Sequence, residues 1–80
     1  MLNTTEVTGI TPFGFWLISN GAEYFIGYDD YPIFIKASIL DIATVETDFM
    51  GNLHWPKLDA DIEIAALNYP DNYPLVGNDV

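Results

Sequence analysis

Apolar and aromatic side chains dominate the segment between Glu6 and Gly27, in short runs typical of β-strands. β-branched, aromatic and aliphatic residues suit a pleated surface. The residues of these types in the segment are Val7, Ile10, Phe13, Phe15, Trp16, Leu17, Ile18, Tyr24, Phe25 and Ile26. The pattern predicts strands over this whole segment.

The dipeptide Asn20-Gly21 separates two of these runs. It favours positive φ at both central positions, as a two-residue hairpin turn requires. The strands should then pair so that Ser19 faces Ala22. The same register places Trp16 opposite Phe25.

A helix is predicted from about Tyr31 to Ser38. Asp29 and Asp30 can cap exposed amides at its start, and Pro32 fits a first helical turn. Apolar residues cover most of its circumference, namely Ile33, Phe34, Ile35 and Ala37. We therefore expect this helix to lie across the sheet with only Lys36 reaching water.

The segment Ile39–Ile42 fits either a continued helix or a strand. A strand pattern returns over Ala43–Phe49, and Met50–Asn52 provides a turn. Leu53–Trp55 then begins another strand, which meets Pro56 at an edge or bend. These two strands form a second predicted hairpin.

A short last helix is predicted from a cap at Asp61 to Leu67, stopped by Tyr69-Pro70. Residues 77–80 are expected to fray. We therefore predict a single α+β domain over residues 1–80. It would have a small antiparallel sheet of four to five strands, one main helix packed on the sheet and a short C-terminal helix.

Acidic residues far outnumber basic ones. The 80-residue chain is 50% hydrophobic, which suffices for a core, but it has 12 acidic residues against Lys36 and Lys57, for a net charge of −10. Two lysines cannot form a groove for nucleic acid or a patch for anionic membranes. There is no apolar run of membrane-spanning length and no cysteine. We expect a cytoplasmic protein without disulfides, direct nucleic-acid binding or membrane insertion.

Three stretches together resemble the small bacterial family catalogued as domain of unknown function 2442. The first stretch is Gly14–Ile18 with Gly21–Ile26. The second is Tyr31-Pro32 with Phe34, Lys36-Ala37 and Val45-Glu46. The third is Leu53–Ile62, which runs on into Tyr73–Val76. The resemblance implies an α+β domain with a helix packed on a small antiparallel sheet. It also implies contexts beside partner genes in toxin–antitoxin-like pairs or fusions to DNA-binding domains, with no established catalytic residues.

No residue pattern indicates an enzyme. His54 is the only histidine, and a strand-face role beside Trp55 is favoured over catalysis. Asp59, Asp61 and Glu63 alternate and could meet a hard cation, but a solvated acidic edge is the favoured interpretation. We therefore expect no metal and no cofactor.

The aromatic residues are assigned mainly to the core, because a small domain needs their area. This assignment covers Phe15, Trp16, Phe25, Phe34 and Trp55. For the tyrosines beside acidic residues, packing in turns and stacking on an arginine of a basic partner remain equal alternatives.

The strongly negative net charge suggests a function in binding a basic partner. About 30 Å of duplex DNA carries roughly 18 charges, comparable to the 12 carboxylates here. We expect a non-enzymatic inhibitor of the DNA-mimic type that blocks the basic surface of a partner, as an anti-CRISPR protein blocks a CRISPR effector. The alternative is an antitoxin-like module that neutralises a co-encoded toxin. The candidate contact residues are Asp29, Asp30, Asp59, Asp61 and Glu63, with Glu23, Glu46 and Asp48 as second choices.

Overall fold

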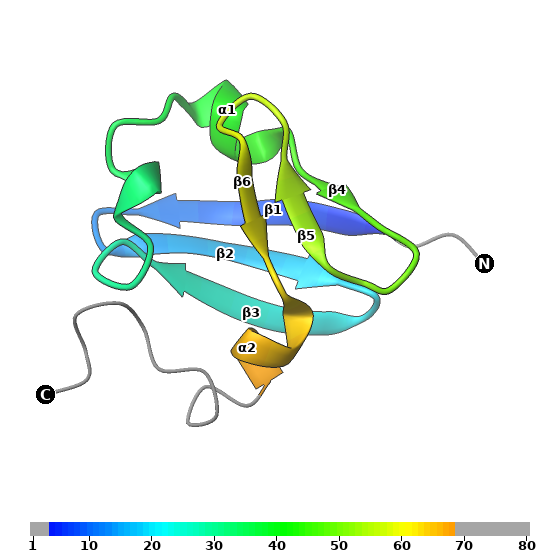
Figure 1. The fold of residues 1–80 in the computed structure, drawn as a ribbon. Helices are drawn as coiled ribbons and strands as arrows, with labels where there is room; N and C mark the ends of the chain where they lie inside the picture. Colours follow the sequence, from blue (N-terminus) through cyan, green and yellow to red (C-terminus); the bar gives the residue numbers. More distant parts are fainter. Residues whose placement is uncertain (1–3, 69–80) are drawn as a thin grey trace, which may run out of the picture.

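The strands form two three-stranded antiparallel sheets in a computed structural model that describes residues 4–68 (Figure 1). The first sheet has the order β1-β2-β3 and the second the order β4-β5-β6. The elements are β1 (Thr5–Thr11), β2 (Gly14–Ser19), β3 (Ala22–Gly27), the 3₁₀-helix η1 (Pro32–Phe34), α1 (Ile39–Ala43), β4 (Glu46–Thr47), β5 (Leu53–Trp55), β6 (Ala60–Ile62) and α2 (Ile64–Asn68). The α+β class is confirmed. The single sheet with one main helix is wrong, because the strands divide between two sheets and both α-helices are short.

The predicted β2–β3 hairpin is confirmed in its register. Ser19 pairs with Ala22 and Trp16 pairs with Phe25. The turn between the strands has φ values of 51° at Asn20 and 84° at Gly21, so both central positions are left-handed, as the dipeptide predicts.

The predicted helix over residues 31–38 is wrong. Only η1 forms there, held by i→i−3 bonds such as the one from the Ile35 N–H to the Pro32 carbonyl (3.0 Å). The β-branched Ile33 and Ile35 favour an α-helix only weakly, and Ser38 has extended backbone (φ −75°, ψ 164°) that ends any helical run. Ile33 and Ile35 are also exposed, so Lys36 is not the only side chain of this segment in water.

Ser38 instead starts a new helix, α1, which settles the ambiguous segment Ile39–Ile42 as helical. The Ser38 hydroxyl accepts the Asp41 N–H (3.0 Å), and the Asp41 carboxylate accepts the Ser38 N–H (3.3 Å). This reciprocal capping box satisfies two amides that a helix start leaves unpaired.

The second hairpin is confirmed, with β4 and β5 joined through the predicted turn around Gly51. Its first strand is shorter than predicted, since β4 ends before Asp48, whose carboxylate accepts the N–H groups of Met50 (2.8 Å) and Asn52 (3.0 Å) within the turn. Those bonds commit Asp48 to the turn.

The expected cap at Asp61 is wrong, because Asp61 lies in β6, a strand that the sequence pattern did not predict. The helix α2 begins later, and its first N–H, from Ile64, is accepted by the side-chain oxygen of Asn52 (3.0 Å). The predicted stop at Tyr69-Pro70 and the frayed residues 77–80 lie outside the described residues.

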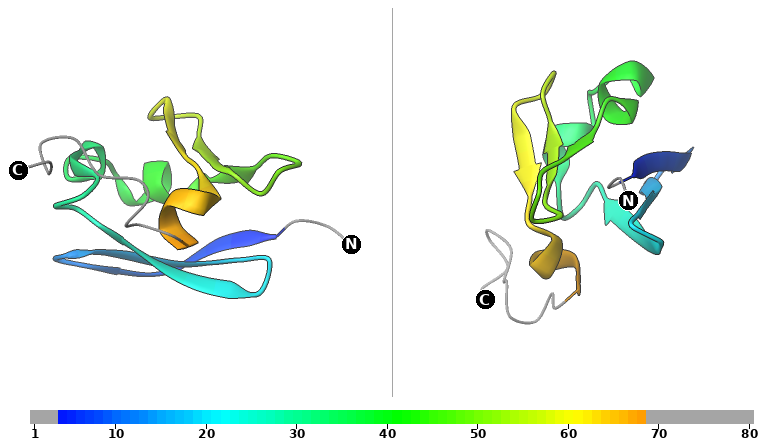
Figure 2. Two further views of the ribbon diagram at one scale, coloured as in Figure 1. Left: turned by 60° about the horizontal axis from the view of Figure 1, so that its bottom comes forward. Right: turned by 90° about the vertical axis from the view of Figure 1, so that its right-hand side faces the viewer.

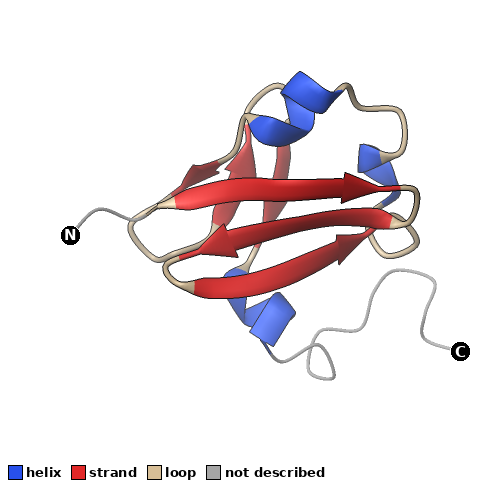
Figure 3. Cartoon of the chain, turned by 180° about the vertical axis from the view of Figure 1, so that it is seen from behind, coloured by secondary structure: helices blue, strands red, loops and turns tan. Residues whose placement is uncertain are grey.

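The two sheets pack as two layers around one core (Figure 2). Phe15 of β2, Phe34 of η1 and Trp55 of β5 meet edge to face, with ring centroids 4.9–6.1 Å apart. The Trp55 indole N–H donates to the Ile42 carbonyl (2.9 Å), so this buried ring also ties α1 to the second sheet. Figure 3 shows the opposite side of the molecule, where the outer face of the first sheet lies in front.

Candidate partner-binding surface

The outer face of the second sheet has a row of three charged or titratable side chains. Glu46 of β4 pairs with His54 of β5, and His54 pairs with Asp61 of β6. The neighbouring β5 residues Leu53 and Trp55 are buried in the core. Because side chains alternate along a strand, the row of three lies on the solvent side of the sheet.

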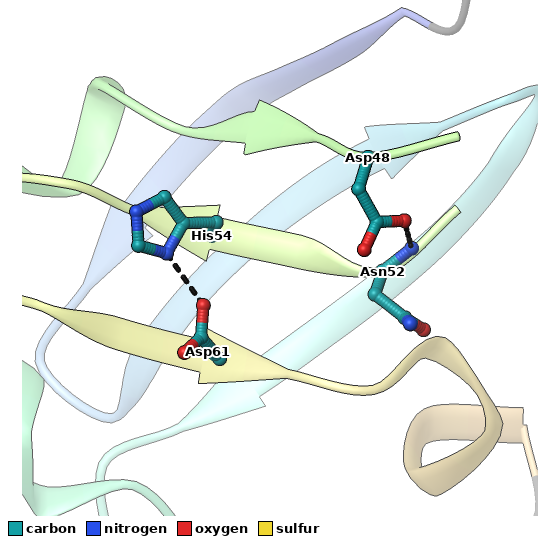
Figure 4. A network of polar contacts seen from close by, with 4 residues as sticks. All are labelled: Asp48, Asn52, His54 and Asp61. Carbon is teal, nitrogen blue, oxygen red and sulfur yellow. Dashed lines mark hydrogen bonds and ion pairs between the residues drawn. The ribbon is translucent and has the colours of Figure 1, made fainter. Parts of the chain in front are cut away.

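His54 and Asp61 form a close pair, with the ring Nδ1 2.5 Å from a carboxylate oxygen (Figure 4). The hydrogen bond to Asp61 raises the pKa of His54 above its ordinary value of 6.5. Desolvation opposes this effect and lowers the pKa, whereas attraction to the charges of Asp61, Glu46 and Asp59 raises it, and the net shift is upward. His54 therefore holds a proton more readily than an isolated histidine.

Three more predicted acidic residues lie at the ends of this sheet. Asp59 lies in the turn between β5 and β6, with φ at 52°. Asp48 follows β4 and Glu63 follows β6. Because β4 and β6 both run antiparallel to β5, Asp48 and Glu63 lie at one end of the sheet and Asp59 at the other.

Five of the eight predicted contact residues thus lie in one small sheet or directly beside its strands. We call these five the acidic surface: Glu46, Asp48, Asp59, Asp61 and Glu63. Lys57 is the only lysine in the segment that carries them. The second sheet and the segments beside it therefore carry five carboxylates and one lysine.

The other three predicted residues lie elsewhere. Asp29 and Asp30 are exposed in the turn after β3, and η1 has Tyr31 at its N-cap without a side-chain capping bond, so their expected capping role is wrong. Burial raises the pKa of Tyr31, and the charge of Asp30 raises it further. Glu23 lies on the first sheet, opposite Ile18, and that pair faces away from the core.

An exposed aromatic pair on the first sheet was not predicted from the sequence. Trp16 and Phe25 are each 40% exposed, so their assignment to the core is wrong. The available signal was strand alternation: Phe15 and Leu17 are buried, so Trp16 between them must face outward.

Within residues 4–68, no group of three or more His, Cys, Asp or Glu side chains is placed to hold a metal ion. Across the same described range, no helix has the length and apolar character to cross a membrane.

Comparison with known proteins gives one match. The family model described as "Protein of unknown function (DUF2442)" matches residues 4–73. No curated protein and no solved structure matches the chain.

Proposed function

The chain belongs to the DUF2442 family, and on that premise we propose that it is a small acidic binding protein that inhibits a basic protein partner. It would occupy the partner's nucleic-acid-binding surface, as a DNA mimic does, without catalysing a reaction. A CRISPR effector is one partner of the required chemistry.

The observation that carries this proposal is the acidic surface. Neighbouring strands lie about 4.8 Å apart, so Glu46 and Asp61, on either side of His54, are separated by about 10 Å across the sheet. Asp48 and Glu63 extend the negative charge to one end and Asp59 to the other. A basic groove would meet carboxylates along the full length of this sheet.

Binding of this kind depends on long-range attraction. Exposed charges attract over roughly 10 Å at 0.1 M salt, and complementary potentials act mainly on the association rate. We therefore expect association that slows markedly as salt is raised. The protonated His54 offsets part of the negative charge, so the surface becomes more acidic as the pH rises through the pKa of His54.

The experiment compares two triple variants that remove the same number of charges. The first, Asp59→Asn with Asp61→Asn and Glu63→Gln, neutralises three residues of the acidic surface. The control neutralises three carboxylates of other elements, namely Asp29→Asn and Asp30→Asn in the turn after β3 and Asp41→Asn in α1, where the asparagine oxygen can still accept the Ser38 N–H. Asparagine also tolerates the positive φ at position 59.

The partner is first captured from host lysate at low salt with tagged wild-type protein and identified by mass spectrometry. We expect duplex DNA to displace the protein from this partner. The acidic-surface triple should associate roughly tenfold more slowly, and the control triple at close to the wild-type rate. Equal losses from both triples, or a complex that DNA does not displace, would contradict mimicry by this surface.

A second candidate, an antitoxin-like module, is favoured by a different observation. Many large apolar side chains are at least 39% exposed: Ile10, Phe13, Trp16, Ile18, Phe25, Ile33, Ile35, Ile39, Leu40, Phe49 and Met50. Apolar contacts are not screened by salt. A one-to-one complex with the product of a neighbouring gene would therefore support this candidate over mimicry if the complex survives purification in about 1 M salt.

A further inference from the structure

An aromatic pair lies on the outer face of the first sheet, on the side that Figure 3 shows in front. Trp16 of β2 and Phe25 of β3 are cross-strand neighbours, with ring centroids 4.9 Å apart and ring planes at 55°. Beside them lies Ile18, 39% exposed. The buried core is complete without these three side chains, so they are available for contact with another molecule.

The side of Trp16 that faces β1 is open. Its cross-strand neighbour there is Gly9, which follows a register shift after Val7. A Cβ atom added at Gly9 would meet nothing within 4 Å, and the φ of this glycine is outside the left-handed range. Phe25 thus flanks Trp16 on one side, while on the other Gly9 has no side chain, and we call the free space that its Cβ would occupy the notch.

Two carboxylates flank the same face. Ile18 pairs with Glu6 of β1 and with Glu23 of β3, so the three side chains form a row across the sheet. This row lies one strand repeat, about 7 Å, from the row of Gly9, Trp16 and Phe25. Both lysines of the chain lie outside the first sheet. Within residues 4–68, neither Glu6 nor Glu23 has a basic partner, so the face combines a partly exposed indole ring with negative charge.

We propose that this face binds an arginine side chain from a basic protein segment. Its guanidinium would stack on Trp16 above Gly9 and pair with Glu6 or Glu23. A planar guanidinium both stacks on aromatic rings and pairs with carboxylates, whereas an ammonium does not stack in this way. The proposal rests on the proposed function in one respect, namely that the partner is basic.

Charge complementarity selects this occupant over a second copy of the chain. The protein has a net charge of −10 and only two basic residues, both lysines. A second copy would therefore bring repulsion and no arginine to the face. An apolar partner would leave Glu6 and Glu23 buried without a counter-charge, which is costly.

The test uses two short acetylated and amidated peptides that differ only in having arginine or lysine at the basic positions. Binding to the full chain is followed by ¹⁵N NMR, with the Trp16 indole N–H as reporter. We expect the arginine peptide to bind at least about threefold more tightly than the lysine peptide and to shift this signal. Equal affinities, or shifts confined to the acidic surface, would overturn the proposal.

Gly9→Val supplies the sharpest variant, because it fills the notch without removing any group that could contact the peptide. The expected result is loss of the preference for arginine, with an unchanged melting temperature. The double variant Glu6→Gln with Glu23→Gln should weaken binding of both peptides. Phe49→Ala is the matched control, since it removes a 92% exposed ring on the second hairpin, and it should leave the preference intact.

The acidic-surface triple separates this inference from the proposed function. If the outer face of the first sheet is a distinct contact, the acidic-surface triple variant retains the preference for the arginine peptide even where it no longer associates with the captured partner. Retained arginine preference in Gly9→Val would refute the notch while leaving the proposed function standing.

Discussion

At the scale of single residues, His54 has the most informative surroundings. It lies between Glu46 and Asp61 in the middle strand of the second sheet, and its ring is hydrogen-bonded to Asp61. Its two flanking strands contribute carboxylates, and the turn after β5 contributes Asp59. All of these groups favour the protonated ring.

The first prediction concerns the pKa of His54. Asp61→Asn removes the hydrogen-bonded charge, so the pKa of His54 should fall toward 6.5. Titration of the His54 ring protons by NMR measures the change. Asp29→Asn, in the distant turn after β3, is the control and should leave the titration curve in place. An unchanged pKa in Asp61→Asn would show that the pair does not form in solution.

The same pair predicts how stability depends on pH. The pKa of His54 is raised in the folded state above its unfolded value near 6.5. Its contribution to stability is therefore fully present below pH 6.5 and is lost as the pH rises through the folded pKa. Thermal melts of wild type and His54→Gln should converge across that window. A gap that widens with rising pH would contradict this sign.

At the scale of elements, local chemistry explains which predictions held. The β2–β3 hairpin was predictable because two adjacent residues determine its turn. The helix over residues 31–38 was not, because its apolar residues indicate burial on all sides, whereas only Phe34 of this segment is fully buried in the core. Strand β6 was missed because it is three residues long and is recognisable only through its pairing with β5.

For the candidate surfaces too, features set by residues close in the sequence were predictable, and features set by the tertiary arrangement were not. The five residues of the acidic surface are close in the sequence, so their clustering needed only the second sheet to form. The separation of Glu23 from them was not predictable, because it depends on the division of the strands between two sheets. The exposure of Trp16 and Phe25 could be predicted only by giving the alternation of side chains along β2 more weight than the usual burial of aromatic residues.

The capping box of α1 supports a prediction at this scale. Ser38→Ala removes the acceptor for the Asp41 N–H and should lower the free energy of unfolding by about 1 kcal/mol. Chemical denaturation provides the measurement. Ser38→Asp keeps an acceptor at the N-cap and should stay close to wild type. A Ser38→Ala protein as stable as Ser38→Asp would show that the cap contributes nothing.

At the scale of the whole molecule, charge opposes folding. The net charge is −10, with 12 acidic residues against two lysines, and His54 pairs with Asp61. Repulsion among carboxylates in a small protein destabilises the compact state. The charge that suits a basic partner therefore lowers the stability of the free protein.

Salt should consequently stabilise the protein. Raising sodium chloride from about 0.02 to 0.5 M shortens the screening length from more than 20 Å to a few Å, and we expect the melting temperature to rise by about 5 °C. The triple variant Glu6→Gln, Asp29→Asn and Asp30→Asn should gain less from salt. Calorimetry at both concentrations measures this, and a fall in melting temperature with salt would contradict it.

The connectivity of the two sheets also has a consequence for folding kinetics. Each strand pairs only with strands adjacent to it in the chain, so every hairpin closes over a short loop. The event that joins residues distant in the sequence is the docking of the two sheets, in which Phe15 from the first meets Trp55 from the second. We therefore expect the docking of two locally formed halves to set the folding rate. During synthesis, the apolar face of the first sheet is exposed to solvent until the second half of the chain leaves the ribosome.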